Sequence, residues 1–240
     1  MELNRPLLKQ QARGLIQTAQ PSVLMTSAIF IALSAVVSFL SNRLVGISYE
    51  TLERYASFLQ QGKVDYALSV LSSSMPSTSA WLINAALNLV MTIVGVGFTL
   101  FILNTVRGVG AAVGNLLDGF GFFWRIILLH LVIYFFVALW SLLLIVPGII
   151  AAYRYSLSTY VLLDHPEYGV MDCIRESKRL TDGRKLELFK LDLSFLGWFL
   201  LSSLPYVGYL VSVWVTPYYE LTRAMYYERY SGHVPAPEYL

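Results

Sequence analysis

The feature that most constrains this chain is a set of long apolar runs that contain almost no charge. Residues 14–42, 80–106 and 193–219 hold no Asp, Glu, Lys or Arg, and the only titratable side chain in 126–146 other than tyrosine is a histidine. A helix needs about 20 apolar residues to cross the hydrocarbon core of a bilayer. Charged residues make up 13% of the chain, against about 25% in soluble domains. The sequence therefore predicts an all-α, polytopic bundle of membrane helices, with residues 1–240 forming one integral membrane domain.

The distribution of basic residues sets the expected number of spans. Six Lys and Arg gather in residues 175–190, and the N-terminal segment is also basic. Cytoplasmic loops are enriched in Lys and Arg, so both segments should lie on the cytoplasmic side. This is possible only if the short apolar stretch 147–163 also crosses the membrane. We expect six transmembrane helices, at about 22–40, 81–103, 126–146, 147–163, 186–204 and 207–227. Five remain the alternative, in which residues 193–219 cross once and the C-terminus is external.

With six spans both termini are cytoplasmic, and a single sizeable segment, 41–79, lies outside. Leu52, Tyr55, Ala56 and Leu59 have the spacing of an amphipathic helix in that segment. Glu50 and Arg54 are placed to pair at i,i+4. The tight sequence Val-Pro-Gly at 146–148 predicts a short external turn.

Residues 166–183 are expected to form a cytoplasmic interfacial helix. Asp164 and Glu167 have the spacing of a capping box, and Gly183 suits the helix end. Apolar and small residues fall on one face and charged residues on the other, which is typical of a helix lying on a membrane surface. A solvated connector packed on the bundle is the other interpretation. The basic residues assigned to this surface are Arg175, Lys178, Arg179, Arg184 and Lys185.

Three polar side chains inside the predicted spans are candidate binding residues: Arg154, Glu220 and His130. Charge within a membrane is costly and is therefore a functional hypothesis by default. Arg154 either binds an anionic group such as a lipid phosphate, or bonds to helix-end carbonyls or to Glu220. Glu220 and Arg223 are expected to form a local pair, and His130 to be a hydrogen-bonded packing residue rather than a ligand.

Catalytic and metal-binding patterns are missing from the sequence. No HExxH, Walker A, nucleophile elbow or Cys/His cluster is present, so we expect no enzyme activity, no cofactor and no metal. The net charge of +2 gives no support for nucleic-acid binding. Cys173 is the only cysteine and is expected to be a small apolar filler on a helix face.

A weak internal echo suggests a repeated unit. Residues 116–119 read Leu-Leu-Asp-Gly before the third span, and residues 180–183 read Leu-Thr-Asp-Gly before the fifth. Residues 7–19 are a candidate third copy. The unit would be an interfacial helix followed by a helical hairpin, although matches of four residues also arise by chance.

The second half of the chain resembles a known family. The segments are VPGIIAAYRYS at 146–156, LDHP at 163–166, ESK at 176–178, GRK at 183–185, LDLSFLGW at 191–198 and TPY at 216–218. They resemble an uncharacterised bacterial integral membrane family, domain-of-unknown-function family nine-seven-five, which is distantly similar to the membrane domain of some glycerophosphodiester phosphodiesterases. The resemblance implies a multi-span membrane fold and no catalytic residues. We expect the protein to lie in the cytoplasmic membrane.

Two functions follow from these observations. The first is a non-enzymatic membrane protein that binds or moves a lipid or another amphiphile. The second is a scaffold or accessory subunit of an envelope enzyme or transporter. Membrane lipids are the expected partners, together with another membrane protein in the second case, and the sequence does not fix an oligomeric state.

Overall fold

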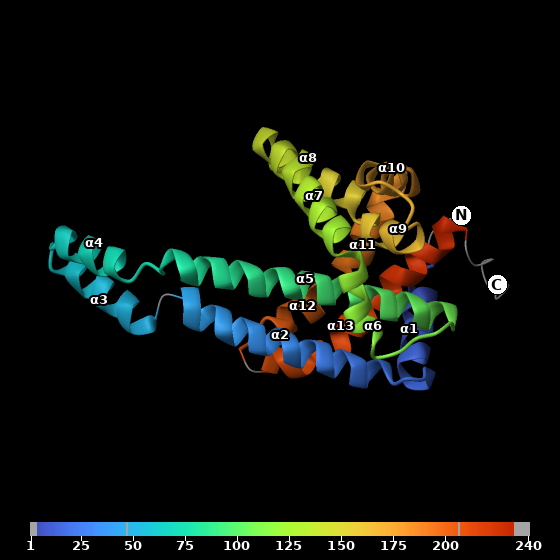
Figure 1. The fold of residues 1–240 in the computed structure, drawn as a ribbon, viewed down its shortest axis with the longest axis horizontal. Helices are drawn as coiled ribbons and strands as arrows, with labels where there is room; N and C mark the ends of the chain where they lie inside the picture. Colours follow the sequence, from blue (N-terminus) through green and yellow to red (C-terminus); the bar gives the residue numbers. More distant parts are fainter. Residues whose placement is uncertain (1–3, 47, 206, 233–240) are drawn as a thin grey trace. The chain divides into compact units, whose positions relative to one another are not determined.

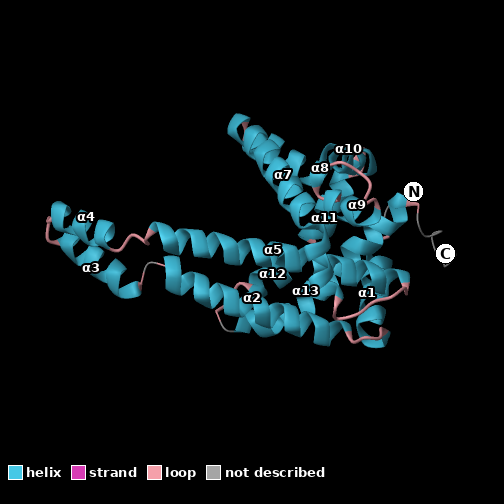
Figure 2. Ribbon diagram, in the orientation of Figure 1, coloured by secondary structure: helices cyan, strands magenta, loops and turns pink. Residues whose placement is uncertain are grey.

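The computed structural model describes residues 4–46, 48–205 and 207–232, and these residues form helices and no strand (Figure 2). The predicted all-α class is therefore confirmed. The longer helices are α1 (Arg5–Thr18), α2 (Val23–Val45), α3 (Tyr49–Gln60), α4 (Val64–Ser73), α5 (Thr78–Arg107), α7 (Phe123–Leu143), α8 (Ile145–Tyr155), α10 (Val170–Thr181), α11 (Lys185–Leu193) and α13 (Val207–Ser231). The shorter ones are α6 (Asn115–Asp118), η1 (Gly119–Phe122), α9 (Ser158–Asp164) and α12 (Leu196–Ser202).

The chain divides into two compact units, one of residues 32–92 and the other of residues 1–31 with 93–240. The first contains α3 and α4, which form a short hairpin (Figure 1). The amphipathic helix predicted around Leu52 is confirmed as α3. The predicted pair of Glu50 and Arg54 is also present, at 3.4 Å, and the rings of Phe58 and Tyr66 stack between the two helices.

In the part of the chain that the structure describes, three candidate membrane spans have the length and apolar composition needed to cross a bilayer: Val23–Gln60, which covers α2 and α3, Thr78–Arg107 and Asn115–Leu143. Helix α7 exposes large apolar side chains that water would solvate poorly. Its Leu131, Phe135 and Leu142 side chains are all exposed, as expected of a helix that faces lipid. The chain is a membrane protein, whereas the number of spans and their orientation remain predictions.

Helices α7 and α8 form a hairpin whose turn differs from the predicted one. The turn lies at Leu144, which is extended, instead of at residues 146–148. Pro147 falls in the first turn of α8, where its missing N–H would have no helical partner anyway. Gly148 lies against Ser141 so closely that a Cβ would overlap that side chain. Small residues therefore set the approach of the two helices, and proline starts the second.

Two predicted spans contain breaks in the structure. Residues 147–163 are divided between α8 and α9, which are interrupted at Ser156 and Leu157. Residues 186–204 are divided between α11 and α12, which are interrupted at 194–195. Breaks of this kind in a membrane protein free backbone groups that other elements must satisfy.

Ser177 of α10 bonds to backbone groups on both sides of the first break, between α8 and α9. Its Oγ donates to the carbonyl of Arg154 at 2.9 Å and accepts from the N–H of Leu157 at 3.2 Å. Ser177 is fully buried, and so is its bond to the N–H of Leu157. The Thr181 hydroxyl also lies 3.5 Å from the Arg154 carbonyl, but among these two hydroxyls only that of Ser177 bonds to both sides of the interruption between α8 and α9.

The second break is held by the basic residues of α1. Arg5 donates to the carbonyl of Lys190 at 3.3 Å, and Lys9 donates to the carbonyl of Ser194 at 3.1 Å. Cations are favourable at helix C-termini, where carbonyls are unpaired. Helix α1 also buries Leu8, Ala12 and Ile16 and packs against α13, so this amphipathic helix lies on the α11–α13 assembly.

Replacing Ser177 with alanine should destabilise the protein by about 1–3 kcal/mol, because the buried N–H of Leu157 loses its side-chain partner and the carbonyl of Arg154 loses the shorter of its two side-chain bonds. Thermal unfolding of the detergent-solubilised full chain, followed by circular dichroism, measures this change. Ser231→Ala is the matched control, since the Ser231 hydroxyl bonds only within its own helix. Equal midpoints for the two variants would show that Ser177 does not hold the break.

The two similar four-residue segments, 116–119 and 180–183, differ in backbone conformation. Gly183 has φ of +70° and follows the end of α10, whereas Gly119 has a helical φ of −53° and begins η1. A short helix does precede the α7–α8 hairpin, as α10 precedes α11. The repeated unit therefore stays a prediction about element order.

Candidate functional site

Helix α10 has the two faces that the sequence predicts. Cys173, Ile174, Ser177 and Leu180 are buried, and burial raises the pKa of the Cys173 thiol to about 11. The thiol is therefore protonated at neutral pH, in keeping with an apolar filler. The outward face holds two i,i+3 ion pairs, Arg175 with Asp172 and Arg179 with Glu176.

The basic residues assigned to a membrane surface belong to two helices instead of one. Arg175, Lys178 and Arg179 lie on α10, while Arg184 and Lys185 precede and begin α11. Hydrogen bonding from Arg179 lowers the pKa of Glu176. Arg184 lies over the ring of Tyr230, 4.3 Å from its centroid, and Lys185 pairs with Asp182 at 3.3 Å. Several of these charges are thus already engaged within the protein.

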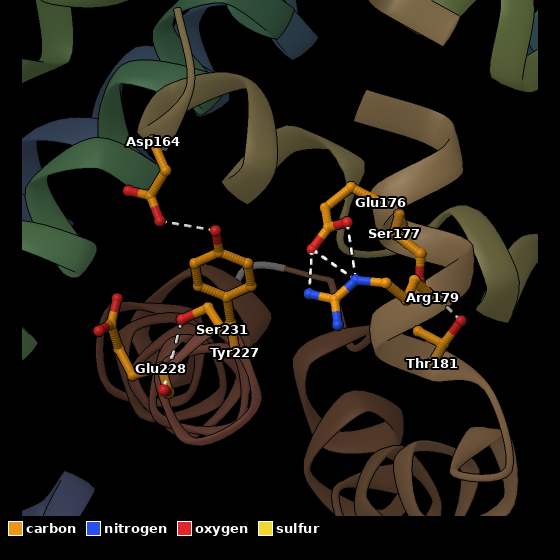
Figure 3. Close-up of polar contacts among 8 residues, drawn as sticks. All are labelled: Asp164, Glu176, Ser177, Arg179, Thr181, Tyr227, Glu228 and Ser231. Carbon is orange, nitrogen blue, oxygen red and sulfur yellow. Dashed lines mark hydrogen bonds and ion pairs between the residues drawn. The ribbon is translucent and has the colours of Figure 1, made fainter. Parts of the chain in front are cut away.

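Asp164 does not cap the interfacial helix as predicted. Helix α10 begins at Val170 after Gly169, and no side chain caps it. Asp164 instead ends α9, and its carboxylate accepts a 2.6 Å hydrogen bond from the Tyr227 hydroxyl (Figure 3). The capping-box interpretation was wrong because α10 begins only at Val170 and a partly buried basic residue from a distant helix binds this carboxylate.

That partner is Arg107, the last residue of α5, which binds two carboxylates. Its Nη1 and Nη2 lie 2.7 and 2.8 Å from the two oxygens of Asp164, and its Nε donates to Glu228 Oε1 at 2.8 Å. The Asp164 and Glu228 side chains are only 2% and 4% exposed. We refer to Arg107, Asp164, Tyr227 and Glu228 as the Arg107 cluster.

The Arg107 cluster has an unequal charge balance, with two carboxylates and one guanidinium. Asp164 is satisfied by Arg107 and by Tyr227. Glu228 uses Oε1 for Arg107, but its Oε2 is buried and has no hydrogen-bond partner among the described residues. Burying a charged oxygen without a partner is costly, so Glu228 is the member with unused binding capacity.

A second polar group lies one to two turns earlier on the same helix. Tyr160 donates to Glu220 at 3.2 Å, Tyr219 donates to Asp192 at 3.1 Å, and Arg223 donates to the Tyr219 hydroxyl at 2.9 Å. The rings of Tyr160 and Tyr227 stack at 5.1 Å. Helix α13 therefore presents one continuous polar face toward α9 and α11.

The structure places the predicted site residues apart from one another. Among the described residues Arg154 makes no ion pair with Glu220, and its Nε is buried without a partner. Glu220 bonds to Tyr160, and the predicted Glu220–Arg223 pair is replaced by the bond from Arg223 to Tyr219. His130 Nδ1 lies 2.9 Å from the Ile126 carbonyl on its own helix, which matches the packing role expected for it.

A groove adjoins the Arg107 cluster, which we call the α1–α13 groove. It has a volume of about 430 Å³. Leu7, Leu8 and Leu15 of α1 and Val106 of α5 supply apolar walls, and Met225, Glu228 and Arg229 line it from α13. The described residues contain no group of three or more His, Cys, Asp and Glu side chains suited to a metal ion. The groove combines apolar surface with a few charged groups, as small-molecule sites commonly do.

The sequence analysis did not single out Arg107 or Glu228. Arg107 is the first charge after the uncharged run 80–106, and this position is the signal that marks it as a group at a membrane boundary. Nothing in the sequence pairs it with Asp164 or Glu228, which lie 57 and 121 residues further along the chain. The three meet only in the folded chain, where the Arg107 side chain at the end of α5 reaches Asp164 of α9 and Glu228 of α13.

Comparison with known families supports the predicted resemblance. Residues 141–233 match the family described as "Protein of unknown function (DUF975)". The matched region contains α8 to α13, including Asp164 and Glu228, whereas Arg107 and α1 lie outside it. No curated protein and no solved structure matched the chain.

Proposed function

We propose, on the premise that residues 141–233 of this membrane protein belong to that family of unknown function, that the chain is a non-enzymatic protein that binds an amphiphile in the α1–α13 groove. The observation that supports this function is the lining of the groove. Aliphatic side chains of α1 and α5 face the same 430 Å³ space as Glu228. A ligand with an apolar tail and a polar head would match both parts.

The position of α1 fits binding from a membrane leaflet. Its buried side rests on α13, while Arg5, Lys9 and Arg13 supply positive charge along the helix. Basic amphipathic helices lie at the surface of anionic membranes. With both termini on the cytoplasmic side, the groove would open near the inner leaflet of the cytoplasmic membrane.

Gly14 offers a direct test of this proposal. It lines the groove, and a Cβ placed on it meets no atom within 4 Å. Gly14→Phe should therefore fill the groove without disturbing the backbone of α1, while Gly14→Ala leaves most of the space. We expect Gly14→Phe to weaken amphiphile binding by about tenfold or more, and Gly14→Ala to change it less than about twofold.

The measurement is photo-crosslinking of the full chain in vesicles that contain a trace of diazirine-bearing phospholipid. Labelling of peptides 7–18 and 225–229 is compared with labelling of the lipid-facing helix α7 in the same sample. Wild type and Gly14→Ala should show excess labelling in the groove peptides, and Gly14→Phe should not. Groove labelling that is unchanged in Gly14→Phe would refute the proposal.

A scaffold or accessory subunit is the second candidate function. The observation in its favour is the outward face of α10, where Arg175 and Arg179 are 76% and 67% exposed. A protein that copurifies in a fixed ratio with wild type, and is lost from an Arg175→Glu/Arg179→Glu variant, would support this alternative.

A further inference from the structure

The buried carboxylate of Glu228 specifies the head of the ligand more closely than the groove alone does. Glu228 is 3% exposed and lines the groove. One of its oxygens binds Arg107, and the other has no hydrogen-bond partner among the described residues. A buried acceptor of this kind requires a donor.

Arg107 does not supply that donor. Its Nη1 and Nη2 bind the two oxygens of Asp164, and its Nη2 and Nε both contact Glu228 Oε1, so Glu228 Oε2 receives no hydrogen bond from it. Tyr227 donates its hydroxyl to Asp164. The cluster therefore has one negative charge more than positive charges, together with one vacant acceptor. A cationic group with an N–H would balance the extra negative charge and would donate a hydrogen bond to the free acceptor.

The form of the cation follows from the hydrogen bond. A primary ammonium has three N–H donors, as the side chain of lysine has, and forms a charge-assisted hydrogen bond to a carboxylate. A trimethylammonium group has the same charge but no N–H to donate. Glu228 should therefore distinguish the two by a hydrogen bond.

Arg229 adds a second requirement. It lines the same groove and forms no ion pair with any described residue, and a guanidinium binds phosphate well. Its positive charge also opposes a ligand that has only an ammonium group. A head that contains both an ammonium and a phosphate would place each charge beside the opposite one.

We propose that the α1–α13 groove binds a phospholipid whose head has a primary ammonium, with the ammonium on Glu228, the phosphate on Arg229 and part of an acyl chain against the leucines of α1. This inference rests on the proposed function, because it names the class of amphiphile that the same groove would take.

The test compares three lipids with identical acyl chains: phosphatidylethanolamine, phosphatidylcholine and phosphatidylglycerol. Each is titrated onto the full chain in detergent, and bound lipid is counted by native mass spectrometry. Wild type should bind phosphatidylethanolamine about tenfold more tightly than phosphatidylcholine, since only the former donates to Glu228. Phosphatidylglycerol should also bind more weakly, because it lacks the cation.

Two variants test the contacts of Glu228 and Arg229 separately. Glu228→Gln keeps the size of the side chain and an oxygen for Arg107, and it should bring the two affinities within about twofold of each other. Arg229→Gln should weaken both lipids by a similar factor and preserve their ratio. Glu167→Gln, an exposed carboxylate outside the groove, is the control and should match wild type.

The outcomes distinguish this inference from the proposed function. If Gly14→Phe abolishes binding but wild type binds the ethanolamine and choline lipids equally, the groove binds an amphiphile and the ammonium assignment is wrong. The assignment is also wrong if Glu228→Gln retains the preference. If Gly14→Phe leaves all lipid binding unchanged, the proposed function fails and this inference fails with it.

Discussion

Replacing Arg107 with methionine should destabilise the protein by about 3–5 kcal/mol, which is the usual cost of removing one partner from a buried ion pair. Asp164 and Glu228 would both keep buried carboxylates and would lose the guanidinium that binds them. Methionine fills a similar volume, so lost packing contributes little to the change. The loss of stability should therefore come mainly from the carboxylates that are left without their cation.

Thermal unfolding of the detergent-solubilised full chain measures this change, and we expect the midpoint to fall by about 10 °C or more. Arg175→Met is the matched control. It also removes an arginine that pairs with a carboxylate, but the Arg175 side chain is 76% exposed, and exposed pairs contribute about 0–1 kcal/mol. An Arg107→Met protein as stable as the control would mean that Asp164 and Glu228 are uncharged in the fold.

A lysine at position 107 makes the prediction sharper. Lysine retains the charge but lacks the planar fork that binds Asp164 through two nitrogens and Glu228 through a third. Arg107→Lys should therefore lie between wild type and Arg107→Met. If it matched wild type, charge alone would explain the cluster, and the three-way geometry would have no energetic role.

Local patterns predicted the helices well. Apolar periodicity identified the buried face of α10 with Cys173, Ile174 and Ser177, and it identified α3 in the segment 41–79. These features depend on residues within a few positions of one another, because helical faces repeat every 3.6 residues. A single sequence contains that information directly.

The helix breaks at 156–157 and 194–195 could not be predicted from local sequence patterns. Neither holds a proline or a glycine that would mark it. The first depends on a hydroxyl about 20 residues away, and the second on Arg5 and Lys9, 185 residues away. Partners that exist only after folding decide where these helices stop.

The candidate site shows the same limit. Intramembrane charge directed attention to Arg154 and Glu220, and Glu220 does belong to a polar face of α13. The pairing of Asp164 with Arg107 was missed because a local capping pattern explained Asp164 equally well. A charge at the end of an apolar run should therefore be considered for long-range pairing before it is assigned to a local cap.

Close approach of α5 to α6 gives the second large effect. A Cβ on Gly97 would overlap the carbonyl of Leu116 and lie 2.5 Å from the carbonyl of Asn115. Both obstacles are backbone, so no side-chain rotation relieves them. Gly119 faces the same contact from the other side, because its own Cβ would meet the carbonyl of Ile93. Small residues permit such packing in membrane helices.

Gly97→Ala should destabilise the protein by about 3 kcal/mol, at the upper end of the usual cost of overpacking, since α5 and α6 must separate to admit one methyl group. Gly95→Ala is the matched control two residues away on the same helix, where a Cβ meets no atom within 4 Å. It should be neutral or stabilising by roughly 0.5–1 kcal/mol, because alanine is the better helix former. Thermal midpoints of the two variants should therefore move in opposite directions or differ widely. Equal midpoints would show that α5 and α6 do not pack through Gly97.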